Sequence, residues 1–306
     1  MKLSIVTTLF CSDLYIETFI LRASKAAKQV AGDDYEIVLV NDDSSDKSLN
    51  KALALYHKDS HITVVDLSRN FGHHKAIMTG LSYARGQDIF LIDSDLEEEP
   101  EWLIPFHEKK IKTKSDVVYG VQILRKGHLA ERFVNGLYYP IISLLSSIQI
   151  PRDMVTARLM SRRYTLSLLR FRERDLDLGG LWCLTGYSQV PYPVTKHSHS
   201  PTTYTFRKKL SLFFNSVTSF SSAPLLSIFY LGMSVFIVSI GYSTWVAVRW
   251  LFTPQPIEGW TSLIISIWLT SGLLIMSVGV VGIYLAHVFN EVKRRPYTIV
   301  RELYRH

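Results

Sequence analysis

The feature that most limits the fold is an alternation of short apolar segments and amphipathic segments over residues 2–123. The apolar segments have the length of β-strands, and the segments between them repeat apolar residues at helical spacing. Strands that alternate with helices form a parallel sheet with right-handed crossovers. The pattern predicts an α/β fold with a mostly parallel sheet, with strands at 2–10, 36–41, 62–67, 88–93 and 116–121 and helices at 15–31, 47–57, 73–84 and 100–112.

Acidic residues follow three of the expected strands. Asp13 comes after the first strand, Asp42 after the second, and Asp93 and Asp95 after the fourth. Open α/β sheets bind ligands at the carboxyl ends of their strands, so these side chains are expected at one edge. Two carboxylates at this spacing can hold a nucleotide and a metal ion, although a solvated strand end explains the same pattern. The first strand is not followed by Gly-x-Gly-x-x-Gly, which argues against a dinucleotide site.

Two long apolar runs predict a second structural unit. Residues 223–251 contain one formal charge, Arg249, and residues 260–289 contain none. Each run exceeds the roughly 20 residues that a helix needs to cross a bilayer, and buried core helices are the less favoured alternative. The connector is short and rich in proline, so the runs are expected to form an antiparallel transmembrane hairpin with helices at 223–252 and 260–289.

Charge and cysteine content suggest where such a chain would reside. Basic residues at 207–209 precede the first run and those at 293–295 follow the second, which predicts that both termini face the cytoplasm. The formal net charge of +7 suits anionic lipid or phosphate ligands, and it points less to nucleic acid because basic residues gather near the apolar runs. Cys11 and Cys183 lack metal-site spacing and fit a reducing compartment.

Three motifs in the first half of the chain occur in a fixed order. They are Val40-Asn-Asp-Asp-Ser-Ser-Asp46, Leu67-Ser-Arg-Asn-Phe-Gly72 and Asp93-Ser-Asp-Leu-Glu-Glu-Glu-Pro100. In this order and spacing the chain resembles the inverting family-2 glycosyltransferases that are similar to dolichol-phosphate mannose synthase. With the C-terminal hairpin it resembles, over nearly its whole length, the bacterial polyprenyl-phosphate glycosyltransferases, including bactoprenol glucosyltransferases.

This resemblance implies a nucleotide-sugar-binding domain of the GT-A type. It implies transfer of a sugar from a nucleotide-sugar, UDP-glucose or a related UDP-hexose, to undecaprenyl phosphate, a polyprenyl phosphate. Asp42 and Asp93 would then contact the nucleoside, with Arg69 of the second motif also on the donor side. Asp95 would hold Mg2+ or Mn2+ on the diphosphate.

The chain also departs from the family pattern. Of the usual Pro-x-Tyr-Asn-Glu-Glu start, only Asp13 keeps a matching carboxylate, assigned to donor binding. Glu97 replaces the usual glutamine and adds an anionic group to the expected metal site. Asp43 stands where glycine is commonest. Arg158 is retained from a Gly-Asp-Phe-Arg-Leu motif, whereas Thr156 stands in place of its aspartate.

Arginine side chains are expected to bind the acceptor phosphate. Arg125 and Arg132 follow the fifth strand and precede an apolar stretch, and an arginine can bind phosphate bidentately. Pairing with lipid or with surface carboxylates is the alternative. A phosphate monoester with a second pKa of about 6 is largely dianionic at neutral pH, so it needs positioning more than a general base. The expected catalytic residues are Asp95 and Arg158, as the resemblance implies, together with Arg125.

The sequence divides into four parts on these grounds. Apolar stretches at 133–145 and 208–220 are too interrupted to span a bilayer, and they predict interfacial helices or, for the first stretch, a helix buried against the sheet. The expected parts are a donor domain at 1–125, an acceptor-side region at 126–222, the hairpin at 223–289 and a basic cytoplasmic tail at 290–306. The expected localisation is the inner membrane, with the lipid bilayer as a partner, and a homo-oligomer is compatible with the sequence.

Other functions fit parts of the sequence. A processive polysaccharide synthase shares the donor domain, but such enzymes carry Gln-x-x-Arg-Trp, and Trp182 is not preceded by that arginine. A non-catalytic membrane scaffold built on a degenerate transferase domain would have lost the carboxylates, which are present. A transferase that modifies a protein or another lipid headgroup stays open.

Overall fold

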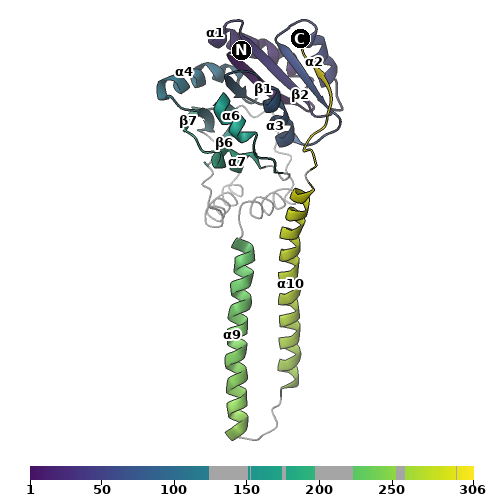
Figure 1. The fold of residues 1–306 in the computed structure, drawn as a ribbon, viewed down its shortest axis with the longest axis vertical. Coiled ribbons are helices and arrows are strands. Elements are labelled where there is room, and N and C mark those ends of the chain that lie inside the picture. The colour runs from purple at the N-terminus through teal and green to yellow at the C-terminus, as the bar shows by residue number, and fades with distance from the viewer. Residues whose placement is uncertain (124–150, 152, 174–176, 197–222, 253–258, 294) are drawn as a thin grey trace. The chain divides into compact units, whose positions relative to one another are not determined.

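The computed structural model describes residues 1–123, 151, 153–173, 177–196, 223–252, 259–293 and 295–306 (Figure 1). The chain forms two compact units. Both termini belong to the first unit, which comprises Met1–Tyr139, Ile148–Thr205 and Arg295–His306. The second unit comprises Pro140–Ser147 and Phe206–Arg294.

The first unit is built on an eight-stranded mixed sheet with the order β7-β5-β6-β4-β1-β2-β3-β8. Its centre is parallel, because β1 pairs with β2 and β4, and β2 pairs with β3, all in the same direction. β6 runs antiparallel between β4 and β5, and β8 runs antiparallel along β3. The strands are β1 (Leu3–Leu9), β2 (Tyr35–Asn41), β3 (Ile62–Leu67), β4 (Asp88–Leu91), β5 (Val117–Gln122), β6 (Met154–Ser161), β7 (Gln189–Val194) and β8 (Val300–Tyr304).

Helices cover both faces of this sheet. All residues of β1, β2 and β3 are buried, which is why their sequences are nearly continuous apolar runs. One hydrophobic core forms under α1, α2 and α4, and the other under α3, α6 and α7. The helices are α1 (Ile16–Ala31), α2 (Ser48–Tyr56), α3 (His73–Tyr83), η1 (Pro100–Trp102), α4 (Leu103–Thr113), α6 (Arg162–Leu168) and α7 (Leu178–Leu184).

The structure confirms the predicted α/β fold, and its sheet contains more strands than the sequence predicts. The first five strands and the four helices between them lie where the sequence predicts them, except that β4 ends at Leu91 rather than at residue 93. The sheet does not end at residue 125, because β6 and β7 come from the predicted acceptor-side region. The predicted tail is also wrong in part, since β8 is an edge strand of the same sheet.

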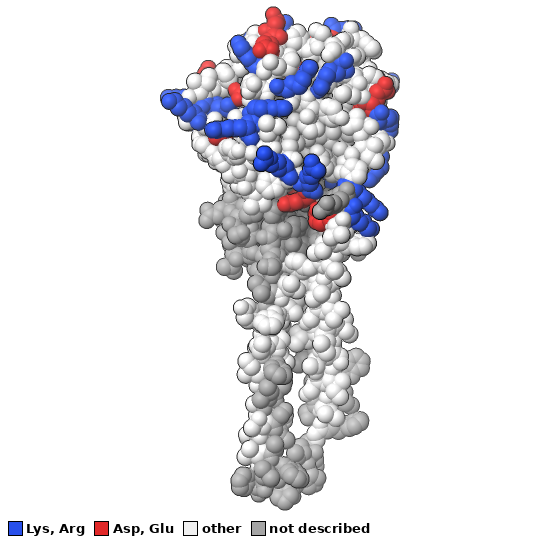
Figure 2. All heavy atoms as spheres, in the orientation of Figure 1, with Lys and Arg blue, Asp and Glu red and all other residues white. Residues whose placement is uncertain are grey.

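The second unit contains two long helices, α9 (Ala223–Phe252) and α10 (Trp260–Val292), which contact each other (Figure 1). Many of their apolar side chains are exposed, including Val238 at 70% and Ile275 at 73%. The described surface of these helices is almost free of charged side chains, whereas Lys and Arg are frequent on the first unit (Figure 2).

Over the residues that the structure describes, no helix reaches the combination of length and mean hydropathy required of a bilayer span. The predicted transmembrane hairpin therefore stays a prediction. The predicted interfacial stretches at 133–145 and 208–220 lie outside the described residues, as do Arg125 and Arg132.

Candidate functional site

The predicted acidic residues lie at one edge of the sheet. Leu9 pairs with Asn41 at the ends of β1 and β2, and Val6 pairs with Leu91 at the end of β4. The loops after these strands carry Asp13, Asp42, Asp93 and Asp95. Parallel pairing thus brings the four predicted carboxylates to the same edge, as expected for the carboxyl ends of strands.

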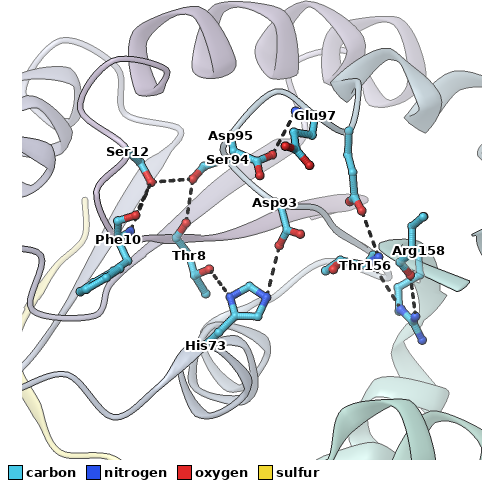
Figure 3. A network of polar contacts seen from close by, with 12 residues as sticks. Thr8, Phe10, Ser12, His73, Asp93, Ser94, Asp95, Glu97, Thr156 and Arg158 are labelled. Carbon is cyan, nitrogen blue, oxygen red and sulfur yellow. Dashed lines mark hydrogen bonds and ion pairs between the residues drawn. The ribbon is translucent and has the colours of Figure 1, made fainter. Parts of the chain in front are cut away.

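Asp93 is held by a histidine at the start of α3. Its Oδ1 lies 3.4 Å from His73 Nε2, and His73 Nδ1 lies 3.1 Å from Thr8 Oγ1 (Figure 3). The imidazole is thereby fixed between the ends of β1 and β4. His73 reaches the donor edge because it is the first residue of α3.

Asp95 lies in a tight turn after β4. Its Oδ1 accepts a hydrogen bond of 3.0 Å from the backbone amide of Glu97, and Leu96 between them has a φ of 59° (Figure 3). Burial, and then the negative charge of Asp93, raise the pKa of Asp95. Two carboxylates that repel each other in this way favour a cation between them.

Glu98 is the buried member of a group of four carboxylates. We call this group, Asp93, Asp95, Glu97 and Glu98, the acidic cluster. Glu98 is fully buried, and its Oε1 accepts a 3.0 Å hydrogen bond from the Thr156 amide. Among the described residues, Glu98 Oε2 has no hydrogen-bond partner. Burial, followed by the charge of Asp93, raises the pKa of Glu98 well above its ordinary range.

Lys196 supplies positive charge to this acidic cluster. Its Nζ lies 3.3 Å from Glu97 Oε2 and 3.8 Å from Glu98 Oε1. Burial alone would lower the pKa of Lys196, but the carboxylate of Glu98 and then those of its neighbours outweigh burial and raise it. Lys196 begins a polar loop in which relatives have basic residues near the active site, and it reaches this cluster because β7, just before it, joins the sheet.

Arg158 is not placed to contact a substrate. The side chain is fully buried, and its Nε and Nη2 donate to the backbone oxygens of Thr156 and Val155, both at 3.1 Å. The guanidinium lies over the Trp182 ring, and within the described part of the chain Nη1 has no partner. Burial lowers the pKa of Arg158 to about 9. In this conformation the guanidinium is enclosed and does not reach a substrate, and Arg158 lies next to Thr156, to one side of Asp93 and Asp95 (Figure 3).

Asp42 binds the protein's own backbone. It is 2% exposed, and its Oδ1 and Oδ2 accept hydrogen bonds from the amides of Phe71 at 2.8 Å and Gly72 at 3.0 Å. The loop after β3 is therefore tied to the end of β2. Asp42 therefore has a structural role in the loop that precedes α3, and its contact with a nucleoside stays a prediction.

Asp13 and Arg69 lie beside these loops. The Asp13 amide donates to Asp46 Oδ2 at 3.0 Å, and its carbonyl accepts from Lys51 Nζ at 2.6 Å. Arg69 is exposed, and its guanidinium lies 4.1 Å from the centre of the Phe71 ring. Both residues occupy the predicted donor side of the edge, and their contact with a nucleotide stays a prediction.

The described residues contain no group of three or more His, Cys, Asp or Glu side chains arranged to hold a metal ion. This does not conflict with the donor set expected for Mg2+, which is commonly held by one or two carboxylates together with substrate phosphates. The carboxylate oxygens of Asp95 and Glu97 are ligands of the kind that such a cation prefers. Lys196 already places a positive charge among the same carboxylates.

Comparison with known proteins identifies the family. The model for glycosyl transferase family 2 matches residues 4–169. The chain belongs to glycosyltransferase family 2. A Mycobacterium tuberculosis protein that is described as a glycosyltransferase is 45% identical over 99% of this chain and 89% of its own length. The bactoprenol glucosyl transferase of Shigella phage SfII is 28% identical over 100% of this chain and 99% of its own.

Solved structures match this chain at lower identity. The structure of S. aureus TarS 1–349 in complex with UDP-GlcNAc is 16% identical, with a TM-score of 0.47, and the match covers 72% of this chain and 66% of that one.

Proposed function

We propose that this family-2 glycosyltransferase transfers a hexose, with inversion, from a nucleotide-sugar to a polyprenyl phosphate such as undecaprenyl phosphate. UDP-glucose or a related UDP-hexose is the proposed donor. The observation that carries the proposal is the acidic cluster with Lys196 at the carboxyl edge of the sheet. The full-length similarity to a protein named bactoprenol glucosyl transferase supports the choice of acceptor.

The donor's diphosphate is the leaving group, so negative charge develops on it during transfer. A divalent cation, Mg2+ or Mn2+, would supply charge stabilisation there when bound. Asp95 and Glu97 are the residues that would hold it. Lys196 is close enough to the same carboxylates to offset their charge and to bind phosphate oxygens by its ammonium group.

The acceptor end of the proposed reaction needs little proton chemistry. A polyprenyl phosphate is already largely dianionic at neutral pH, because the second pKa of a phosphate monoester is about 6. Arg125 and Arg132 remain the proposed ligands for this headgroup. Thr156, which holds Glu98 through its backbone amide, stands where relatives have an aspartate, and no general base is required of it.

We also propose that α9 and α10 anchor the protein in the inner membrane, with the sheet unit and both termini in the cytoplasm. The length of the helices, 30 and 33 residues, and their exposed apolar side chains support this. A cysteine placed within 253–258, in a chain with Cys11 and Cys183 replaced by serine, should react with an impermeant reagent on intact cells. Labelling of a cysteine placed in the sheet unit would refute this orientation.

Activity is tested with the full chain in lipid, undecaprenyl phosphate, Mg2+ and radiolabelled UDP-glucose, UDP-galactose or UDP-GlcNAc. The expected product is a lipid carrying one sugar, and Asp95→Asn should abolish its formation while leaving the thermal transition in place. Asp33→Asn is the matched control, because Asp33 is exposed at the opposite edge of the sheet. A polymeric product would favour a polysaccharide synthase, and the absence of any transfer with every donor would favour a scaffold.

A further inference from the structure

The C-terminal strand carries an arginine at an irregularity in the sheet. In the pairing of β8 with β3, Asp66 faces Glu302 and Leu67 faces Val300, so Arg301 is an extra residue between the two pairs. Such β-bulges redirect a side chain and are frequent beside active sites. Here the bulge directs Arg301 across the carboxyl edge of β3.

The Arg301 guanidinium joins three segments of the sheet unit. Its Nη1 donates to Asp66 Oδ2 on β3 at 3.2 Å, and its Nη2 donates to Asp43 Oδ1 after β2 at 3.0 Å. Nη2 also donates to the backbone oxygen of Ser68 after β3, at 2.9 Å. The loops after β2 and β3 are the two loops that the Asp42 carboxylate also ties together.

Arg301 forms ion pairs with two carboxylates, those of Asp43 and Asp66. Asp43 adopts a φ of 52°, a left-handed conformation that is uncommon for residues other than glycine. Asp66 is buried, and its Oδ1 accepts a 2.7 Å hydrogen bond from Asn41 Nδ2 at the end of β2. Without Arg301, two carboxylates beside the donor edge would repel an anionic diphosphate.

We propose that Arg301 is a positioning residue for the nucleotide-sugar, which holds the loops after β2 and β3 and neutralises Asp43 and Asp66. The inference rests on the proposed function and deepens it, because it makes the C-terminal strand part of the donor site. It also gives the short segment after α10 a role in donor binding, since β8 follows that helix directly in the chain.

The proposal is tested by measuring UDP binding in the presence of Mg2+ by calorimetry, with the full chain in nanodiscs. Arg301→Gln should weaken UDP binding by roughly 5-fold to 20-fold, the range set by one or two half-exposed charge-assisted hydrogen bonds. Arg301→Lys should lose less, because its ammonium can still pair with one carboxylate. Arg305→Gln is the matched control on the same segment, since Arg305 donates to the backbone oxygen of Tyr83 at the end of α3.

A second variant separates positioning from simple strand stability. If Arg301 acts by neutralising Asp43, then Asp43→Asn should restore part of the UDP affinity lost in Arg301→Gln, while the thermal transitions of Arg301→Gln and Arg305→Gln stay alike. Wild-type affinity in Arg301→Gln, or an equal loss in Arg305→Gln, would overturn the proposal while leaving the proposed function intact. A wild type that binds neither UDP nor another nucleoside diphosphate would refute both.

Discussion

Replacing Asp42 by asparagine should release the loop that leads into α3. The two carboxylate oxygens accept from two adjacent backbone amides, Phe71 at 2.8 Å and Gly72 at 3.0 Å. Asparagine has one acceptor oxygen, and its amide nitrogen would face the second backbone donor. With Asp42 only 2% exposed, water has little access to replace the lost acceptor.

The magnitude follows from these two bonds. A hydrogen bond to a charged group contributes about 1.5–3 kcal/mol, and a buried donor left without a partner costs about 1–3 kcal/mol. We expect the local opening free energy of the loop to fall by about 3 kcal/mol, which corresponds to a roughly 150-fold faster amide exchange. The overall unfolding transition should move much less, because the core strands are unaffected.

The assay is amide hydrogen exchange without nucleotide, followed at Phe71 and Gly72. Asp42→Asn should expose both amides, and Asp33→Asn should change neither. Unchanged protection at Phe71 and Gly72, combined with weaker UDP binding, would refute this reasoning. That result would instead favour direct contact between Asp42 and the nucleoside, as the sequence alone predicts.

Two further substitutions test the sheet unit. Gly80→Ala would place Cβ 2.6 Å from Val6 Cγ1 and 2.8 Å from Val40 Cγ2, so chemical denaturation should show a loss of about 1–3 kcal/mol; unchanged stability would mean that α3 can move away from the sheet. Burial acts to raise the pKa of Asp116, but its hydrogen bond from Arg163 and other donors outweigh burial and lower it. This stabilisation is present above the unfolded carboxyl pKa and is lost as pH falls through the folded value, so Asp116→Asn should flatten the acid side of a plot of Tm against pH.

The central strands were predictable because both of their faces are buried. A strand covered by helices on each side must be apolar throughout, and β1 and β2 have no exposed residue. The helices between them show the helical period because only one face of each packs on the sheet. Parallel order then fixes the carboxyl edge, which is why Asp93 and Asp95 could be assigned to a site without coordinates.

The edge strands were not predictable for physical reasons. β7 contains Pro191 and Pro193, which lack a backbone donor and are tolerated at the edge of a sheet, where β7 lies. β8 carries Arg301 and Glu302 in five residues, a pattern that blunts an exposed edge but does not resemble a strand. Lys196 and Arg301 reach the donor edge through these two strands, so their positions depend on strands that the periodicity of the sequence does not predict.

Arg158 presents the opposite case, a predicted site residue whose burial changes its expected role. Burial lowers the pKa of Arg158 to about 9, because the enclosed guanidinium has lost its hydration. Burying an ion costs on the order of several kcal/mol. The two hydrogen bonds to carbonyl oxygens and the contact with the Trp182 ring each stabilise the folded state by about 1 kcal/mol, which offsets part of this cost. Arg158→Met, which keeps most of the volume, should therefore change the unfolding free energy by less than about 2 kcal/mol.

The same substitution should weaken UDP binding, because the guanidinium charge acts on Glu98 and offsets the negative acidic cluster. Calorimetry and chemical denaturation of Arg158→Met separate the two effects, and Arg158→Ala, which leaves a cavity, provides the destabilised comparison. Normal UDP affinity in a stable Arg158→Met protein would show that the charge serves neither binding nor catalysis. A loss of stability as large as that of Arg158→Ala would show instead that the two β6 backbone oxygens require the guanidinium as their hydrogen-bond donor. The buried guanidinium would then stabilise the fold.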